Sequence, residues 1–578
     1  MPLSGVPYSE LRLDRLLNVA AADNAAGVNY WAGVARTQSA RLIGGSKPLR
    51  HASRVTLAPW TTDLILEPTQ DFASQGVATG LSGIFGAVVQ SSDIWHATYP
   101  KTTLSAPVVR GERIIPVADA SLFQANRTML FWEDAIWGGP GGGSALAKKS
   151  EVKQIQSVDL DADIVTLREP LECDYTTACT VRQYADEVCR LDNIIIIGRG
   201  QTSFNGIATV NFSRVSFGYV EVVDAPLAGF RNYGAARLQG QRVHVERADQ
   251  AGQGYGLANS GCHNINVGQV HAEHCRHALT HGGGASFIHM SRHHNYGLVT
   301  GIGCMDAIAD WHPGCVDVTI GTISGTCNPQ GALDGQAQSG NPGSADAVQF
   351  QGSGFSCDKI DVTGFRGSGL RGQFYADGDG VARAFRVGHL KAHQNKGPDW
   401  TPDAEGDGLG YGFLWDDSGM VPGNPSSRVS LIHIGSLDIE ADRGLRINAT
   451  AAQIDRVFIG AGPIVTRDDR YDAVRIDAET DGVETGAINR VELRGTDIDC
   501  AAQEAAAYGV YLIGHAGAPM KALLDNVHVN GGNNSIRATH ADVTLTPTTT
   551  LTGAFSDDVL LGTGGTVGQQ APPVTALS

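Results

Sequence analysis

The chain has 578 residues, a formal net charge of −17, 42% hydrophobic and 18% charged residues, and 73 glycines. The hydrophobic content excludes a disordered chain, and the glycines do not recur at every third place as in collagen. The negative charge argues against a nucleic-acid partner, because phosphate binding needs clustered Lys and Arg. Glycines scattered among Val, Ile, Asn, Asp and Thr indicate short strands joined by tight turns.

The first ten residues, Met1 to Glu10, lack the basic segment and apolar run of a signal peptide. No stretch approaches the length needed to span a bilayer. The ten cysteines have no zinc-like spacing and are interpreted as small buried core residues with free thiols. We expect the chain to be made and folded in cytoplasm, without membrane insertion.

Residues 1–104 are predicted to cap and open a repetitive fold. One helix is expected from about Leu11 to Arg36, because apolar residues recur there at near-helical spacing. Short strands are expected at Ser39–Ile43, Arg54–Leu57 and Asp63–Leu66. A helix in this position would cover the open end of a solenoid, whose first coil otherwise exposes an unpaired strand edge.

Residues 105–190 are interpreted as a small inserted β-rich domain. A hairpin-like run at Val108–Val117 is followed by strand-forming runs at Met129–Trp132, Val152–Val158 and Ile164–Leu167. The Gly-rich stretch at Trp137–Ser144 is expected to be a loop. This pattern differs from the repeats that follow, so a separate unit is expected.

Residues 191–541 show the repeats of a solenoid, with strands that start roughly 20–30 residues apart. Asn264–Gly268 and Asp317–Gly321 share a template of a polar residue, alternating apolar residues and a glycine. Two wider gaps, at 327–347 and 396–426, are expected to be loop excursions from one wall. Residues 542–578 are expected to form a β tail that closes the solenoid or packs in an oligomer.

Other β-rich architectures fit less well. A β-propeller needs four strands per blade with stronger aromatic signatures, and a TIM barrel needs a helix after every strand. The segments between these strands are too rich in Gly, Asn and Asp for helices. The sequence therefore predicts an all-β fold, a right-handed parallel β-helix with an N-terminal capping helix and a small inserted β domain.

Three groups of residues resemble segments of phage tailspikes and related pectate-lyase-like β-helix proteins. The predicted helix and first strands, with Leu42-Ile43-Gly44-Gly45, resemble the opening coils of that family. The second group is similar to a domain that is inserted in tailspike-like proteins. It consists of Val117–Phe123, Gln154–Val158 and Leu167–Leu171. A central segment common in such proteins resembles Arg276–His281, followed by Asp306 and Asp310–Gly314.

This resemblance implies a homotrimer in the virion, in the tail or spike, together with other virion tail proteins. It implies binding of a bacterial surface polysaccharide along the β-helix wall. Many such proteins are polysaccharide depolymerases, acting as hydrolases or lyases, and some only bind. The family places its acids variably, so the resemblance itself assigns no catalytic residue.

Asp306, Asp310 and His312 are the preferred catalytic candidates. Glycoside hydrolysis needs two carboxyl groups, and residues two apart in a strand, such as Asp310 and His312, share a face. Arg276 and His281 from the preceding coil are expected to contact the substrate. In the competing interpretation Asp310 caps a turn and His312 stacks on the neighbouring coil.

A second candidate site combines acids with aromatic residues, which suits a carbohydrate groove where rings stack on sugar faces. Its substrate-binding candidates are Tyr375, Asp377, Asp379, Trp400, Tyr411, Trp415 and Asp416. The competing interpretation is a solvated acidic loop anchored by its aromatic residues. Calcium would suit these oxygen ligands, but the spacing does not match an EF-hand.

No cofactor or metal is predicted. His274, His277 and His281 would line one face only if residues 273–281 were helical, and no HExxH spacing occurs. The strand pattern just before them indicates stacked or solvent-facing histidines instead.

The sequence thus predicts a tailspike-like glycosidase that binds and cleaves a bacterial surface polysaccharide. Hydrolysis is favoured over a lyase reaction, because the cations that would neutralise a uronate are spread over several coils. One alternative is a non-catalytic virion fibre or receptor-binding spike for host attachment. The other is a free bacterial polysaccharide lyase or hydrolase.

Overall fold

The computed structural model of the chain describes residues 10–17, 24–38, 40–43, 49–50, 55–57, 64–65, 69–71, 79–84, 100–138, 147–184, 188–192, 194–198, 205–250, 252–282, 291–327, 346–374, 381–394, 410–416, 428–449, 452–467, 471–478, 486–500, 507–552, 554 and 559–569.

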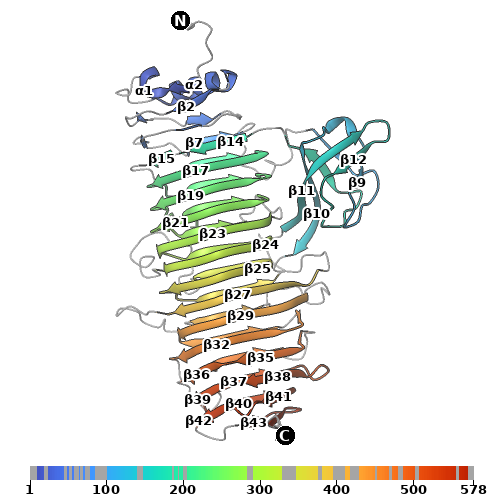
Figure 1. Cartoon of the computed structure of the whole chain (residues 1–578), viewed down its shortest axis with the longest axis vertical. Helices are drawn as coiled ribbons and strands as arrows, with labels where there is room; N and C mark the ends of the chain where they lie inside the picture. Colours follow the sequence, from blue (N-terminus) through green and yellow to red (C-terminus); the bar gives the residue numbers. More distant parts are fainter. Residues whose placement is uncertain are drawn as a thin grey trace, which may run out of the picture.

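Thirty-eight strands in the described part form one parallel sheet, wound nearly into a barrel, which confirms the predicted parallel β-helix. The coils follow one another along the molecule in chain order, so the colours run from blue at one end of the column to red at the other (Figure 1). The strand pairings divide the sheet into two sets, which we call the short-strand wall and the long-strand wall.

The short-strand wall comprises β4 (Val55–Leu57), β7 (Thr79–Ile84), β16 (Asn205–Val210), β18 (Ala228–Tyr233), β20 (Tyr255–Ser260), β22 (His277–His281), the first parts of β24 (Ala307–Cys327) and β25 (Val348–Thr363), β26 (Ser368–Phe374), β28 (Tyr411–Asp416), β30 (Arg443–Asn448), β33 (Val474–Asp477), β37 (Tyr508–Ile513), β40 (Asn534–Thr539) and β43 (Val559–Leu561).

The long-strand wall comprises the later parts of β24 and β25 together with β1 (Glu10–Arg12), β2 (Arg41–Ile43), β3 (Leu49–Arg50), β5 (Leu64–Ile65), β6 (Thr69–Asp71), β14 (Val188–Asp192), β15 (Ile194–Ile197), β17 (Arg214–Val223), β19 (Leu238–Glu246), β21 (Ile265–Glu273), β23 (Ser291–Cys304), β27 (Arg383–His393), β29 (Arg428–Ala441), β31 (Gln453–Ile454), β32 (Val457–Thr466), β34 (Ala487–Ile488), β35 (Arg490–Arg494), β36 (Thr496–Cys500), β38 (Met520–Asp525), β39 (His528–Gly531), β41 (Ala541–Leu545), β42 (Thr550–Thr552) and β44 (Thr566–Gln569).

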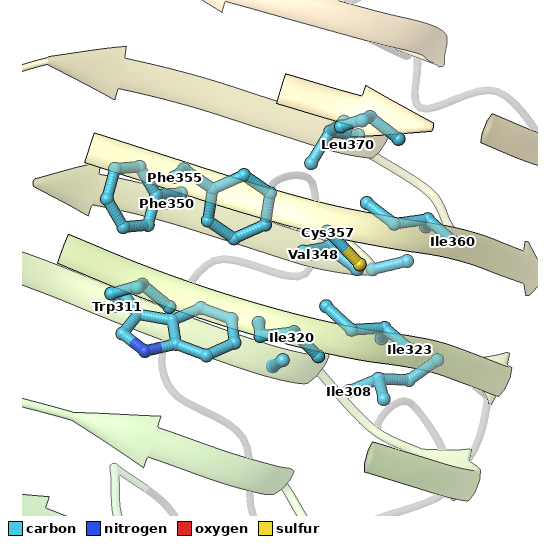
Figure 2. Packing of buried hydrophobic residues seen from close by; sticks show 14 of the residues in the cluster. Ile308, Trp311, Ile320, Ile323, Val348, Phe350, Phe355, Cys357, Ile360 and Leu370 are labelled. Atoms are coloured by element: carbon cyan, nitrogen blue, oxygen red, sulfur yellow. The ribbon is translucent and has the colours of Figure 1, made fainter. Parts of the chain in front are cut away.

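Alternate residues of each strand point into the column, where they stack on the equivalent residue of the next coil. Trp311 pairs in register with Phe350, and both side chains are fully buried. Figure 2 shows these two rings beside Phe355, whose centroid lies 4.8 Å from that of Phe350. Burying one such side chain contributes about 1.5–3 kcal/mol, so the stacked interior stabilises every coil through its neighbours.

One column of the interior is polar. Thr209, Asn232, Asn259 and His281 occupy equivalent positions in four successive coils and are all buried. Thr209 Oγ1 donates to Asn232 Oδ1 over 2.6 Å, and Asn232 Nδ2 donates to Asn259 Oδ1 over 2.9 Å. The Tyr296 hydroxyl lies 2.5 Å from His281 Nε2. We call these residues the interior polar ladder.

The corners between walls use left-handed backbone. Four residues with positive φ lie at or just beyond the ends of β17, β19, β21 and β23, in four successive coils. They are Asp224, Arg247, His274 and Gly303, with φ values of 57°, 58°, 52° and 62°. Gly, Asn and Asp adopt this region at low cost. Such corners explain why the segments between strands are rich in these residues.

A separate antiparallel sheet projects from the column beside its early coils (Figure 1). Its strands, in spatial order, are β8 (Lys101–Thr103), β13 (Thr180–Gln183), β10 (Thr128–Gly138), β11 (Ala147–Asp159), β12 (Ile164–Leu167) and β9 (Ile114–Pro116). It encloses its own hydrophobic cluster, which includes Phe131, Ile155 and Val165. The sheet spans Lys101–Gln183, and the inserted domain was expected at 105–190.

A partly buried ion pair joins the inserted sheet to the column. Arg292 of β23 is 1% exposed, and its Nη1 lies 3.0 Å from Glu172 Oε2. Arg292 Nε also donates to the Ser150 carbonyl over 3.3 Å. Lys153 contacts the same Glu172 carboxylate. These contacts fix the sheet against the wall.

Three predicted elements differ in the structure. The single helix expected from Leu11 to Arg36 is wrong, because β1 is followed by α1 (Leu13–Leu16) and, later, α2 (Ala25–Gln38). The loop expected at 396–426 contains β28, whose pairing with β26 makes it part of the wall. The strands of the expected tail pair with the preceding coils, so the solenoid continues to Gln569.

All ten cysteines are free and buried. Within the described residues, no helix is long and apolar enough to cross a membrane.

Candidate functional site

The short-strand wall brings Arg276, Asp306, Asp310 and His312 together. β22 and β24 are neighbours in parallel register, with His277 opposite Ala307 and Thr280 opposite Asp310. The Asp306 N–H donates to the Arg276 carbonyl over 3.1 Å, which fixes the corner before β24. We call these four residues, with His277, the Asp306 centre.

Two carboxylates organise the Asp306 centre. Arg276 Nη2 donates to Asp306 Oδ2 over 2.9 Å, and His277 Nε2 lies 3.5 Å from the same oxygen. Asp310 Oδ2 lies 3.0 Å from His312 Nε2. The side chains of Asp306 and His312 are 24% and 39% exposed, whereas that of Asp310 is 5% exposed. Asp306 and His312 therefore face solvent, and Asp310 lies behind His312.

The protonation states at the centre diverge. Burial raises the pKa of Asp306 to about 6, the Asp310 carboxylate adds to this shift, and Arg276 opposes it. Burial also acts to raise the pKa of Asp310, but the charge and hydrogen bond of His312 outweigh it and lower that pKa to about 2. The Asp310 carboxylate in turn raises the pKa of His312 above its usual value. Such a divergence separates a proton acceptor from a proton donor.

The arrangement supports acid–base chemistry. Above about pH 6 Asp306 is mainly ionised, and the raised pKa of His312 favours its protonated form. One group can therefore accept a proton while the other donates one. His277 is 3% exposed, and burial holds its pKa well below the usual value, so it stays neutral. Tyr255 stacks on His277 at 5.6 Å between centroids and closes one side of the centre.

Two predicted substrate contacts are wrong, because the side chains point into the column. His281 is fully buried, stacks on Trp311 at 5.9 Å and belongs to the interior polar ladder. Trp415 is also fully buried and packs edge-on against Phe385 at 5.4 Å. Neither ring can contact a glycan on the outer surface.

The rest of the second candidate site is described only in part. Tyr375, Asp377, Asp379 and Trp400 lie outside the described residues. Tyr411 is 5% exposed, and its hydroxyl accepts from Arg443 and Arg446 at 3.1 and 3.4 Å. Asp416 Oδ2 lies 3.8 Å from Arg371 Nη2. Tyr411 and Asp416 therefore lie on the short-strand wall, as the Asp306 centre does, but several coils further along the column.

Sequence reasoning missed a run of arginines and tyrosines on this wall. In successive coils Arg446 pairs in register with Arg475, Arg475 with Tyr511, and Tyr511 with Arg537. A signal for them exists, since each arginine stands between two apolar residues of a short strand: Leu445-Arg446-Ile447, Val474-Arg475-Ile476 and Ile536-Arg537-Ala538.

Two groups in the described part of the chain have ligand atoms close enough to hold a metal ion. They are His244 with His271 and Glu273, and Glu172 with His293 and Asp317. In the first, His271 Nε2 lies 2.9 Å from Glu273 Oε1, and in the second, His293 Nε2 lies 3.0 Å from Glu172 Oε1. Because these side chains already pair with each other, neither group needs an ion.

A pocket also lies between the inserted sheet and the long-strand wall. Its lining includes Arg127, Lys153, Glu172, Arg214 and His293. Since the Arg292–Glu172 ion pair lies at this junction, the pocket is part of the docking interface and is separate from the Asp306 centre.

No protein-family model matches the sequence, and no curated protein matches it. Among solved structures, the chain is similar to the tailspike gp49 of Pseudomonas phage LKA1, with 12% identity and a TM-score of 0.49 over 95% of this chain and 78% of that one. It is similar to the gp54 tailspike of Acinetobacter baumannii phage AP22, solved in complex with a capsular saccharide, with 12% identity and a TM-score of 0.46 over 86% and 77% of the two chains.

It is also similar to the tailspike gp61 of Pseudomonas phage phi297, with 14% identity and a TM-score of 0.43 over 89% of this chain and 84% of that one. At these identities individual site residues cannot be aligned, so residue roles are taken from this chain's own geometry.

Proposed function

We propose that the protein is a tailspike that binds a bacterial surface polysaccharide along the short-strand wall and hydrolyses it at the Asp306 centre. The observation that carries the proposal is that Asp306 and His312 both face solvent on one part of the short-strand wall, where Arg276 holds the first and Asp310 the second. Both groups have raised pKa values, which suits proton transfer. The sequence resemblance to tailspikes further supports a homotrimer located in the phage tail.

The proposed reaction uses the two exposed groups of the centre, with an imidazolium in place of the second carboxyl group that glycoside hydrolysis usually employs. Protonated His312 donates its proton to the glycosidic oxygen as the bond from that oxygen to the anomeric carbon breaks. The Asp306 carboxylate accepts a proton from the water whose oxygen adds to the anomeric carbon. Asp310 is a positioning residue, because its buried carboxylate reaches His312 and not the solvent.

Arg276 has a supporting role in this proposal. It lies 2.9 Å from the Asp306 carboxylate and opposes the effect of burial, which favours the protonated acid. The guanidinium therefore keeps Asp306 available as a base at neutral pH. Its Nη1 also donates to the Tyr255 hydroxyl over 3.4 Å, which ties the centre to the preceding coil.

The proposal is tested by incubating the protein with a panel of capsular and O-antigen polysaccharides and analysing the products by mass spectrometry. Discrete saturated oligosaccharides are expected from the native protein, with about 10²-fold or greater loss of rate in Asp306→Asn and His312→Gln. Asp497→Asn, the same change at an exposed residue of the long-strand wall, is the matched control and should leave the rate unchanged.

Other outcomes decide against parts of the proposal. An unsaturated terminal uronate would show elimination instead of hydrolysis. A polysaccharide that binds but remains intact would make the protein a receptor-binding spike without catalytic activity. Absence of both binding and cleavage across the panel would reject the proposed function.

A further inference from the structure

Four arginines gather on the short-strand wall beyond the Asp306 centre. Arg446, Arg475 and Arg537 point outward from β30, β33 and β40, since the residues on either side of each are buried. Arg443, at the start of β30, lies beside them and is 5% exposed. With Tyr471, Tyr508 and Tyr511 they form what we call the arginine–tyrosine patch.

The positive charges of this patch are only partly compensated. Arg475 Nη2 donates to Asp477 Oδ2 over 2.8 Å, and its Nη1 lies 3.8 Å from Asp472 Oδ2. Arg446 donates to the Tyr411 hydroxyl, and Arg537 to the Tyr508 hydroxyl. Within the described part of the chain, Arg446 and Arg537 thus contact neutral oxygens and form no ion pair. The patch carries net positive charge in a protein of net charge −17.

The spacing of the charges is unfavourable without a ligand. Arg446 and Arg475 stand directly opposite each other on neighbouring strands, at the sheet spacing of about 4.8 Å. Like charges in this relationship destabilise a sheet. Asp477 and Asp472, which lie beside Arg475, offset part of this repulsion. An anion bound beside Arg446 would offset more of it.

Arg443 gives a second, independent indication. It is buried to 95%, and its Nη1 donates to the Tyr411 hydroxyl while its guanidinium lies 3.3 Å from the Tyr471 ring centroid. Among the described residues its Nε has no hydrogen-bond partner. The same holds for the buried Nε of Arg446 and of Arg537. Buried donors without partners are costly, and charge-assisted bonds from a guanidinium to an anion are among the strongest hydrogen bonds.

Aromatic rings complete the patch. Arg475 lies over the Tyr511 ring at 5.2 Å, and Arg537 lies over the same ring at 4.7 Å. Tyr508 and Tyr511 meet edge to face at 5.0 Å. Tyr511 is partly exposed, so one ring offers a sugar face a stacking surface beside two guanidiniums.

The patch and the Asp306 centre lie on one line along the column. The register runs from Asp310 through Gln349, Arg371 and Leu414 to Arg446 in four steps. At about 4.8 Å per step, Arg446 lies roughly 19 Å from Asp310 along the wall. A polysaccharide several sugars long that occupies the centre therefore also reaches the patch.

We propose that the arginine–tyrosine patch is a subsite for the carboxylate of an acidic sugar, so that the polysaccharide contains uronic-acid-type residues. The inference rests on the proposed function for its polymer. The planar guanidinium matches a carboxylate with two parallel hydrogen bonds, which lysine cannot provide.

The test compares methyl glucuronide with methyl glucoside, which differ only at the carboxylate, by ligand-observed NMR titration of the full protein. The glucuronide is expected to bind about 10-fold more tightly, as for a hydrogen bond to a charged group. Arg446→Gln and Arg537→Gln should each reduce this preference toward 1. Arg428→Gln, at an exposed arginine of the long-strand wall, is the control and should keep it.

Equal binding of the two monosaccharides, or an unchanged preference in both patch variants, overturns the proposal. Tighter binding of glucose 6-phosphate than of the glucuronide would overturn the assignment of the subsite to a carboxylate and would assign it to a phosphate substituent. The titration uses no polymer, so its result is separate from the cleavage test. A polysaccharide panel left uncleaved, with Arg-dependent glucuronide binding, would reject the hydrolase and leave the subsite standing.

Discussion

Asp310 and His312 lie two residues apart in β24 and contact each other across 3.0 Å, yet the first is 5% exposed and the second 39%. The buried carboxylate therefore orients the imidazole that meets the solvent. This arrangement assigns different roles to two residues that the sequence presents as equivalent candidates.

Asp310→Asn tests this division of roles. The amide keeps the shape of the carboxylate but removes its charge, so the pKa of His312 should fall and the imidazole should lose its proton near neutral pH. We expect kcat to fall about 10²-fold or more, with KM nearly unchanged and the alkaline limb of the pH profile moved to lower pH. A loss of kcat without movement of that limb would contradict the positioning role.

The pH profile of cleavage follows from Asp306. Its pKa of about 6 means that the base is lost as pH falls below this value. On the alkaline side, activity should fall as His312 loses its proton, at a pH above the usual pKa of histidine. We expect a bell-shaped plot of kcat/KM, whose acid limb moves to lower pH in a variant that leaves Asp306 more exposed. A profile that is flat between pH 5 and 7 would exclude Asp306 as the base.

Trp415→Ala should act on stability and leave glycan contacts intact. The ring is fully buried against Phe385, so truncation leaves a cavity and costs about 3–5 kcal/mol. The midpoint of urea unfolding should fall accordingly, and Trp415→Phe should lose less. If the variant unfolds like the native protein but binds polysaccharide more weakly, the buried placement of Trp415 is wrong.

The buried histidines make the fold sensitive to acid. Burial lowers the pKa of His294 to about 3, below its unfolded value near 6.5, so the unfolded chain binds more protons as pH falls below 6.5. Stability should then decrease by about 1.4 kcal/mol per pH unit for this group until about pH 3. Urea midpoints measured from pH 7 to pH 4 should fall less steeply in His294→Gln, and equal slopes would contradict this.

Arg292→Met tests how the inserted sheet is held. The substitution removes the guanidinium that contacts Glu172 and the Ser150 carbonyl, while Lys153 and His293 still contact the Glu172 carboxylate. We therefore expect a loss of about 1–3 kcal/mol at this interface. We expect limited proteolysis to cleave near the junction and release the sheet while the column persists. Arg190→Met, at an exposed arginine of β14, should keep the native pattern.

The sequence was sufficient for the architecture because a template of alternating apolar residues recurs in several coils. One copy of it, Asn264–Gly268, coincides with the start of β21 (Ile265–Glu273) in the structure. The opening helix was placed wrongly, since the apolar spacing reveals neither that Leu11 and Arg12 belong to β1 nor that α1 ends at Leu16.

The candidate site could be predicted only in part. The structure brings together four of the predicted residues: Arg276, Asp306, Asp310 and His312. They could be predicted because they belong to neighbouring coils, which are close to each other in the sequence. His281 and Trp415 show what the residue pattern leaves open. Alternation tells which residues share a face, but the packing of adjacent coils decides which face is inside. The arginines of the patch come from distant segments, and only the register aligns them.

The interior polar ladder has a consequence for how the column assembles. Its amides and hydroxyl are satisfied only when Thr209, Asn232, Asn259 and His281 meet in consecutive coils. If one coil were threaded a single residue out of step, its ladder residue would turn to the outside and leave its neighbour's donor buried and unsatisfied. Purely apolar columns tolerate such slippage at lower cost. The ladder therefore favours the correct stacking order of these four coils over a shifted one.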